Sequence, residues 1–261
     1  MKTVEENHFL SLQTSSNYKE SFMKYILKFK LEKNCIRKDY RSTIISFFKK
    51  SISNYMNGHF YNEFYNEKAN KKSLVWSIKF VEPKFEKNQI SLGSNLFDIT
   101  LRIQDEKTAL VYYSSILGMK NVDFNLGNDN KMILTQIKMV RDSDITSDVV
   151  EFKIFSPVCL RQHNRETNND RYICIEDEDF GIELNKKLKE DLEFFDREIN
   201  SLLFNFDGLR KTVVNAHGLM FPVTIGSFIV KGNPNVLNMI KNRGIGSRRN
   251  SGFGLIEPYY K

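Results

Sequence analysis

Hydrophobic and polar residues alternate along the first clearly patterned segment of the chain. From Met23 to Leu31 every second residue is apolar, and most of the residues between them are lysines. This two-residue period is typical of a β-strand with one buried face. After Asp39, which we expect to cap a helix, apolar residues recur at helical spacing as far as Tyr55.

The rest of the first half continues this alternation of strands and helices. A small helical piece is predicted over 58–67. Strands are predicted over 73–81, 89–94, 98–103 and 131–140, and a helix over 108–119. The main order is strand, helix, two strands, helix, strand.

The second half repeats that order. A strand over 149–155 ends in Ser156-Pro157, and a long helix is predicted over 178–204. A hairpin over 211–215 and 219–230, turned near His217 and Gly218, a helix over 234–240 and a strand over 253–258 complete the set.

Two βαββαβ units in tandem are the α+β arrangement of ferredoxin-like, or RRM-like, domains. The polar stretch 142–148 is the expected boundary between them. We therefore predict an N-terminal arm over 1–22, a first ferredoxin-like domain over 23–145 and a second over 149–261.

Composition supports folded domains and an anionic partner. The 261 residues are 41% hydrophobic and 13% aromatic, which is enough for packed cores. The net charge is +7, with ten basic and three acidic residues between Lys19 and Lys50 and six basic and one acidic from Lys231 onward. Net charge alone does not choose between nucleic acid and an acidic membrane surface. Basic segments in both halves favour an electropositive cleft for nucleic acid.

Other features bear on compartment and cofactors. Cys35, Cys159 and Cys174 are widely spaced and form no CxxC pair, so neither a zinc ribbon nor a disulfide framework is indicated. No signal peptide and no run of eighteen apolar residues is evident, and a cytoplasmic protein without membrane contact is expected. Clustered carboxylates at 142–148 and 176–179 could bind a metal if they converged. The favoured interpretation is that 142–148 is a linker between domains and that 176–179 is the acidic N-terminus of a helix. No metal or other cofactor is therefore expected.

The most informative segment is GIGSRRNSGFG at 244–254. Glycine permits backbone conformations closed to other residues and allows close approach of another chain. Consecutive N–H groups can form an anion-binding concavity, and Arg248 and Arg249 offer guanidinium groups to phosphate. The segment has no GK[ST] and follows a helix, so it is not a P-loop. The alternative to phosphate binding is that the segment is a structural turn leading into an edge strand.

This segment resembles the C-terminal glycine-rich signature of the Cas6 family, CRISPR-associated endoribonucleases of the RAMP superfamily. The resemblance extends to KDYR at 38–41 leading into FFKK at 47–50, KSLVWS at 72–77, VEFKIFSP at 150–157 and GLMFPVTIGSFIVKG at 218–232. The second-strand segment departs from the usual text, which is closer to KxFTFS.

The resemblance implies a fold and an activity. Cas6 proteins have two ferredoxin-like domains and cut CRISPR precursor RNA once per repeat without metal. The 2′-hydroxyl attacks the adjacent phosphate, which leaves 2′,3′-cyclic phosphate and 5′-hydroxyl ends. The implied partners are precursor and guide RNA, together with other Cas proteins of an interference complex. The residues implied to bind RNA are Gly244, Gly246, Arg248, Arg249, Asn250, Gly252, Phe253 and Gly254.

The implied chemistry needs an acid–base group and a cation. Histidine suits either proton-transfer role near neutral pH. Of the four histidines, only His59 lies between the first helix and the second strand, where the family commonly has a catalytic histidine. The resemblance therefore implies His59 as general base or acid, with Lys72 or Lys71 stabilising the phosphorane. A capping or surface role for His59 is the alternative, and His163 in the polar stretch 162–170 is a further residue that could touch RNA.

Two other functions remain open from the sequence. A non-catalytic member of the superfamily would hold guide RNA and keep the glycine-rich segment. A generic RNA-recognition module fits the fold but leaves that segment unexplained.

Overall fold

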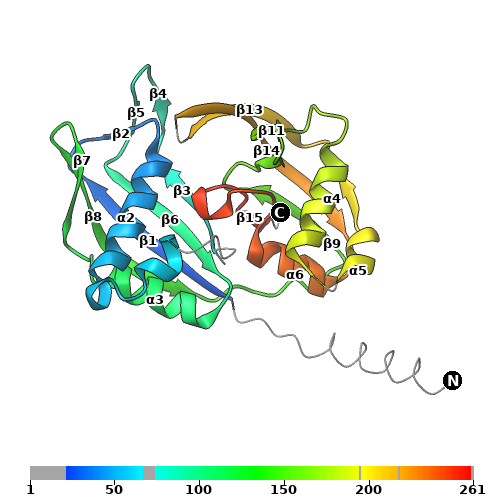
Figure 1. Ribbon diagram of the computed structural model, residues 1–261, viewed down its shortest axis with the longest axis horizontal. Coiled ribbons are helices and arrows are strands. Elements are labelled where there is room, and N and C mark those ends of the chain that lie inside the picture. The colour runs from blue at the N-terminus through cyan, green and yellow to red at the C-terminus, as the bar shows by residue number, and fades with distance from the viewer. Residues whose placement is uncertain (1–21, 67–73, 194, 217, 260–261) are drawn as a thin grey trace.

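The computed structural model describes residues 22–66, 74–193, 195–216 and 218–259. They form two α+β halves that lie side by side, each built on an antiparallel sheet (Figure 1). Each half has its own hydrophobic core.

The first half has the strand order of a ferredoxin-like sheet. Its elements are β1 (Met23–Leu31), α2 (Tyr40–Asn54), β3 (Leu74–Phe80), β6 (Leu96–Ile103), α3 (Glu106–Leu117), β7 (Asp123–Gly127) and β8 (Asn130–Val140). The sheet order is β3-β6-β1-β8-β7, so the two central strands of the βαββαβ unit are its first and third. A small separate sheet joins β2 (Cys35–Arg37), β4 (Lys84–Phe85) and β5 (Gln89–Ser91).

Local sequence explains where the first helices begin. The Asp39 carboxylate accepts a hydrogen bond from the Ser42 amide at 3.3 Å, and the Asp105 carboxylate caps α3 through Thr108 in the same way. Each cap satisfies a backbone amide that has no partner within the helix. Between α2 and β3, two short helices follow: η1 (Tyr55–Gly58) and η2 (Asn62–Asn66).

The second half repeats the topology with an inserted hairpin. Its elements are β9 (Val149–Ile154), β10 (Leu160–Asn164), β11 (Asn169–Ile173), α4 (Phe180–Asp191), α5 (Asp196–Asn200), β12 (Leu203–Asn205), β13 (Leu209–Ala216), β14 (Leu219–Lys231), α6 (Pro234–Arg243), η3 (Arg249–Ser251) and β15 (Ile256–Pro258). The order β12-β14-β9-β15 matches that of β3-β6-β1-β8 in the first half. The tandem ferredoxin-like prediction is therefore confirmed.

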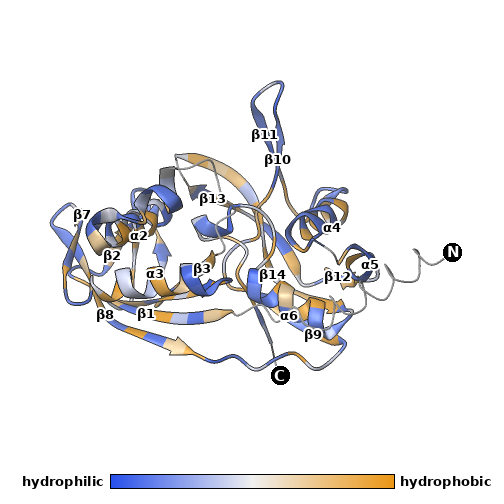
Figure 2. Ribbon diagram, turned by 60° about the horizontal axis from the view of Figure 1, so that its bottom comes forward, coloured by the Kyte–Doolittle hydropathy of each residue, from blue (hydrophilic) through white to orange (hydrophobic). Residues whose placement is uncertain are grey.

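The structure corrects two sequence-based predictions. The single helix expected over 178–204 is instead α4, α5 and strand β12, because the helical backbone ends at Leu192 (φ −114°, ψ 60°). The polar stretch 162–170, expected to be a loop, lies largely in the β10–β11 hairpin. Figure 2 shows this hairpin projecting from the body, with hydrophilic residues toward its tip. No helix within the described ranges is long and apolar enough to cross a membrane.

Candidate nucleic-acid interface

The glycine-rich segment connects α6 to β15 and lies against the first half of the chain (Figure 1). The indole N–H of Trp76, on β3, donates to the backbone carbonyl of Asn250 at 3.0 Å. Arg41, in the first turn of α2, donates from Nε to the carbonyl of Gly252 at 3.2 Å. The segment is therefore held by two elements of the other half.

Its four glycines are buried, and each makes a contact that a side chain would prevent. A Cβ on Gly252, at φ +82°, would lie 2.7 Å from the Trp76 ring. A Cβ on Gly244 would lie 2.5 Å from the carbonyl oxygen of Gly254, and one on Gly246 would lie 2.6 Å from that of Cys159. The close approach that these glycines allow is thus to atoms of this protein, whereas the sequence pattern predicted close approach of another chain.

The two neighbouring arginines of the segment have different environments. The guanidinium of Arg249 pairs with the buried Asp191 carboxylate on α4 at 2.9 Å, and burial lowers the pKa of Arg249. Arg248 turns the other way: its Nη2 donates to the Tyr172 hydroxyl at 2.8 Å, and its guanidinium lies over the Tyr172 and Phe221 rings. Arg249 thus holds the segment onto α4, whereas Arg248 faces the β10–β11 hairpin.

Arg248 also has an unusual backbone conformation. Its φ of 57° places it in the left-handed region, which costs a residue with a Cβ about 1–2 kcal/mol. Its Nε is buried and has no hydrogen-bond partner among the described residues. Strain of this kind persists only where the surrounding structure holds the residue.

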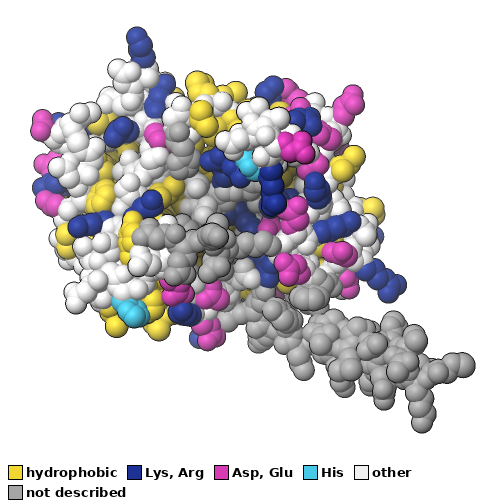
Figure 3. All heavy atoms as spheres, in the orientation of Figure 1, with side chains coloured by type: hydrophobic (Ala, Val, Ile, Leu, Met, Phe, Trp, Pro, Cys, Tyr) yellow, Lys and Arg dark blue, Asp and Glu magenta, His cyan; other side chains and the backbone are white. Residues whose placement is uncertain are grey.

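Three arginines from separate elements surround the thiol of Cys159. Burial raises the pKa of Cys159 to about 12, while the charges of Arg248, Arg161 and Arg41 oppose that rise and Asp170 adds to it. The thiol therefore stays protonated near neutral pH. Three cations and one carboxylate at this point leave an excess of positive charge, and Figure 3 shows Lys and Arg side chains gathered below the β10–β11 hairpin.

His59 lies in a different setting. It is exposed between η1 and η2, its backbone N–H donates to Met56 at 3.1 Å, and its ring packs edge-on against Phe60 at 4.9 Å between centroids. These contacts are all local, and none of them joins His59 to the glycine-rich segment. Lys71 and Lys72 lie outside the described residues, so the pairing of His59 with either lysine stays a prediction.

The aromatic residues near His59 and on α2 belong mainly to the core. Tyr65 hydrogen-bonds to Tyr112 at 3.0 Å between hydroxyls, and burial raises the pKa of Tyr65 to about 12. Phe47, Phe48 and Trp76 are almost fully buried. The packing interpretation of these rings is thus the one that the structure supports.

The carboxylates considered as metal ligands are engaged elsewhere. Asp142 pairs with Lys24 at 3.1 Å and with Arg102, and Asp177 accepts from the Cys174 amide at 2.8 Å. Within the described ranges no group of three or more His, Cys, Asp or Glu residues is arranged to hold a metal ion.

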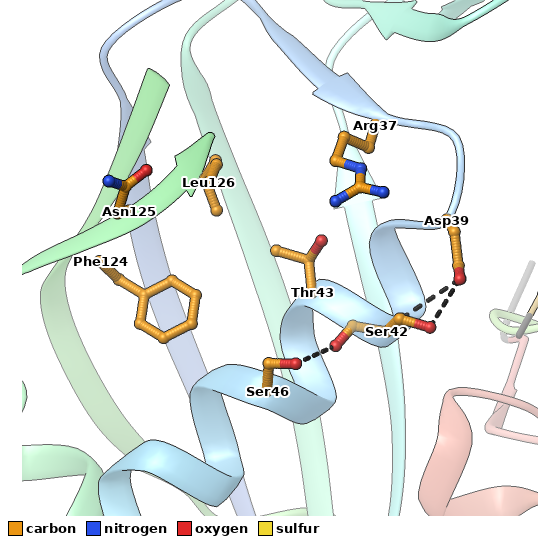
Figure 4. Close-up of a pocket in the computed structure, with 8 residues that line it drawn as sticks. All are labelled: Arg37, Asp39, Ser42, Thr43, Ser46, Phe124, Asn125 and Leu126. Atoms are coloured by element: carbon orange, nitrogen blue, oxygen red, sulfur yellow. Dashed lines mark hydrogen bonds between the residues drawn. The ribbon is translucent and has the colours of Figure 1, made fainter. Parts of the chain in front are cut away.

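A shallow cavity of about 200 Å³ lies between α2 and β7, apart from the arginine cluster (Figure 4). Its lining residues are Arg37, Asp39, Ser42, Thr43, Ser46, Phe124, Asn125 and Leu126. The Asp39 carboxylate already caps α2 there, and none of the predicted site residues lines the cavity. It therefore does not mark the candidate site.

Several residues of this interface escaped the sequence analysis. Arg41 was part of a helix motif and Asp170 part of the polar stretch 162–170, whereas Asp191, Arg161 and Tyr172 were not singled out. The asparagines at 164, 168 and 169 are typical of a turn and are the signal that could have indicated a hairpin.

Comparisons with known proteins agree with this architecture. Residues 138–258 match the family model "CRISPR associated protein Cas6, C-terminal". No curated protein sequence matches the chain.

Solved structures match along nearly the whole chain. The product of a Cas6-related gene from Pyrococcus furiosus has a TM-score of 0.75 at 15% identity and covers 92% of this chain and 100% of its own. An RAMP protein binding different RNA substrates has a TM-score of 0.74 at 13% identity, with 91% and 100% covered. A Cas6 product complex has a TM-score of 0.69 at 14% identity, with 92% and 100% covered.

Residues 138–258 are thus similar to the C-terminal part of Cas6 proteins, and the tandem ferredoxin-like fold is shared with solved Cas6 and RAMP proteins.

Proposed function

We propose that this protein is a CRISPR repeat endoribonuclease that processes precursor CRISPR RNA into guide RNAs by metal-independent attack of a 2′-hydroxyl. The observation that carries the proposal is the arginine cluster at the junction of the two halves, beside the glycine-rich segment of a Cas6-family fold. An RNA backbone is the polyanion that such a cluster suits. Precursor and guide RNA are the proposed partners.

In this proposal the second half of the protein binds RNA and the first half carries the catalytic groups. Arg248 and the face of the second half around it bind phosphates and set the register of the RNA. His59, on the first half, serves as general base for the 2′-hydroxyl or as general acid for the 5′-oxygen, and Lys72 or Lys71 balances the added negative charge of the phosphorane. The buried glycines contribute by holding the segment that carries Arg248.

Related structures support an RNA substrate. Among solved relatives of the same fold, one is an RAMP protein binding different RNA substrates and others are Cas6 product complexes. A histidine exposed on one half and an arginine cluster at the junction would let one RNA strand contact both.

One assay tests the proposal. The purified protein is incubated in EDTA with an RNA copy of one repeat from the source genome, beside the same RNA carrying a 2′-deoxy nucleotide before the mapped cleavage position. We expect single-site cleavage of the first RNA only. Binding of both RNAs without cleavage would favour the alternative function, a non-catalytic subunit that holds guide RNA. Cleavage of the 2′-deoxy RNA would exclude attack by the 2′-hydroxyl.

A further inference from the structure

One face of the β10–β11 hairpin carries a cluster of charged and titratable side chains. Arg161 pairs with Tyr172 across the strands, and His163 pairs with Asp170. Because residues two apart on a strand point to the same face, these four side chains share one face of the hairpin. The intervening pair, Gln162 and Arg171, points to the other face, where the Arg171 guanidinium binds Asp179 at 2.7 Å.

The four side chains are in mutual contact. His163 Nδ1 lies 2.8 Å from one carboxylate oxygen of Asp170, and Arg161 Nη1 donates to the other at 3.1 Å. The Tyr172 hydroxyl lies 3.4 Å from the same second oxygen, and it accepts from Arg248 of the glycine-rich segment. Arg248 Nη2 is itself 3.6 Å from Asp170.

This arrangement leaves the charge of the cluster positive. Hydrogen bonding by His163, together with the charges of Arg161 and Arg248, holds the pKa of Asp170 below its usual value despite some desolvation. Asp170 is therefore ionised near neutral pH and offsets one of the two arginines. Because Asp170 occupies Nδ1 of His163, the ring presents Nε2 outward, and the side chain is 39% exposed.

We propose that Arg161, His163 and Arg248 form a phosphate-binding subsite for RNA on this face of the hairpin, in which protonation of His163 adds a further positive charge. Asp170 positions the imidazole, and Tyr172 positions Arg248. The inference rests on the proposed function, since it names a second contact for the same RNA, away from His59.

Protonation gives this subsite a pH dependence that arginine alone cannot provide. Arginine stays charged at all accessible pH values, whereas histidine gains its proton between about pH 8 and pH 5. The groups facing His163 are Asp170 on β11, Arg161 on β10, and Tyr172 and Arg248 at the base of the hairpin. RNA affinity should therefore rise as pH falls through that interval.

The test is a binding titration at pH 6 and pH 8 with fluorescent repeat RNA that carries the 2′-deoxy nucleotide, so that cleavage does not intervene. H163Q should lower RNA affinity about fivefold at pH 6 and by a smaller factor at pH 8. R161Q should lower affinity at both pH values. R171Q is the matched control, because it removes the same charge from the opposite face of the same strand pair, and it should bind as the wild type does.

Each other outcome counts against the subsite. If the wild type binds RNA but H163Q keeps the full pH dependence, or if R171Q weakens binding as much as R161Q, the subsite is wrong and the proposed function stands. If the wild type binds no RNA at either pH, the proposed function and the subsite both fail. A second readout is the ¹⁵N resonance of His163 Nε2, which should shift on RNA binding at pH 6 and would stay fixed if no phosphate contacts it.

Discussion

Trp76 and Asn250 join the two halves of the protein through one hydrogen bond, from the indole N–H to a main-chain carbonyl at 3.0 Å. Trp76 is fully buried on β3, and its ring lies against the Cα of Gly252 two residues further along the segment. The segment that carries Arg248 is therefore fixed relative to the first half, which holds His59. Under the proposed function, an RNA bound at Arg248 would therefore reach His59 at a defined separation.

Gly252→Ala should lower the free energy of unfolding by about 2–4 kcal/mol. The added Cβ meets the buried Trp76 ring at 2.7 Å and also places a side chain at a positive φ. Urea denaturation followed by tryptophan fluorescence measures the change. Gly127→Ala is the control: it has the same strained φ, +78°, but open space around the new Cβ, so it should cost only about 1 kcal/mol. Equal losses for both variants would show that Trp76 does not constrain the segment.

Arg248 and Arg249 should respond differently to removal of their charge. Arg248→Gln should weaken RNA binding and reduce the slope of log affinity against log salt by about 0.7, the value for one phosphate contact on a single strand. Arg249→Gln should instead destabilise the fold by about 3 kcal/mol, because it leaves the Asp191 carboxylate buried without its partner. Salt titrations and urea denaturation of both variants separate the two roles, and a reversed pattern would contradict the assignment.

His59→Ala should lower the single-turnover cleavage rate by about 10²-fold and leave RNA affinity nearly unchanged, as expected for loss of a general acid or base. The comparison variant is Arg171→Gln, on the face of the β10–β11 hairpin opposite the proposed subsite, which should keep the rate of the wild type at saturating RNA. Cleavage by His59→Ala at the wild-type rate would remove this residue from the mechanism.

The ion pairs of Asp142 with Lys24 and Arg102 of the first half should weaken in acid. Desolvation alone would raise the pKa of Asp142, but Arg102, Lys24 and Lys241 outweigh it and hold the pKa below the usual 3.8. A lowered folded-state pKa stabilises the fold above pH 3.8, and this contribution disappears as the pH falls below it. Asp142→Asn should therefore cost about 1 kcal/mol at pH 7 and progressively less as the pH falls below 3.8. A cost independent of pH, by urea denaturation, would show that ionisation of Asp142 plays no part.

The sequence predicted the fold more completely than the site. Alternation from Met23 and the Asp39 cap are local signals, and the elements they indicate are those observed. The α4–α5 break at Leu192 went unpredicted because polar and apolar residues keep a helical spacing across it.

The site depends on contacts between distant residues, which spacing does not encode. Arg248 and Arg249 are adjacent and chemically alike, yet one faces Tyr172 and the other Asp191 on α4. Sequence spacing likewise does not show what the glycines contact. Their number indicated a close approach, but only the structure shows that they approach Trp76 and main-chain carbonyls.

The chemistry of the RNA ends tests the central claim most directly. Repeat RNA is incubated with the protein in EDTA, and the fragments are analysed by mass spectrometry. The account predicts one cleavage position, a 2′,3′-cyclic phosphate on the upstream fragment and a 5′-hydroxyl on the downstream one. Fragments with 3′-hydroxyl and 5′-phosphate ends, or RNA that remains intact, would contradict it.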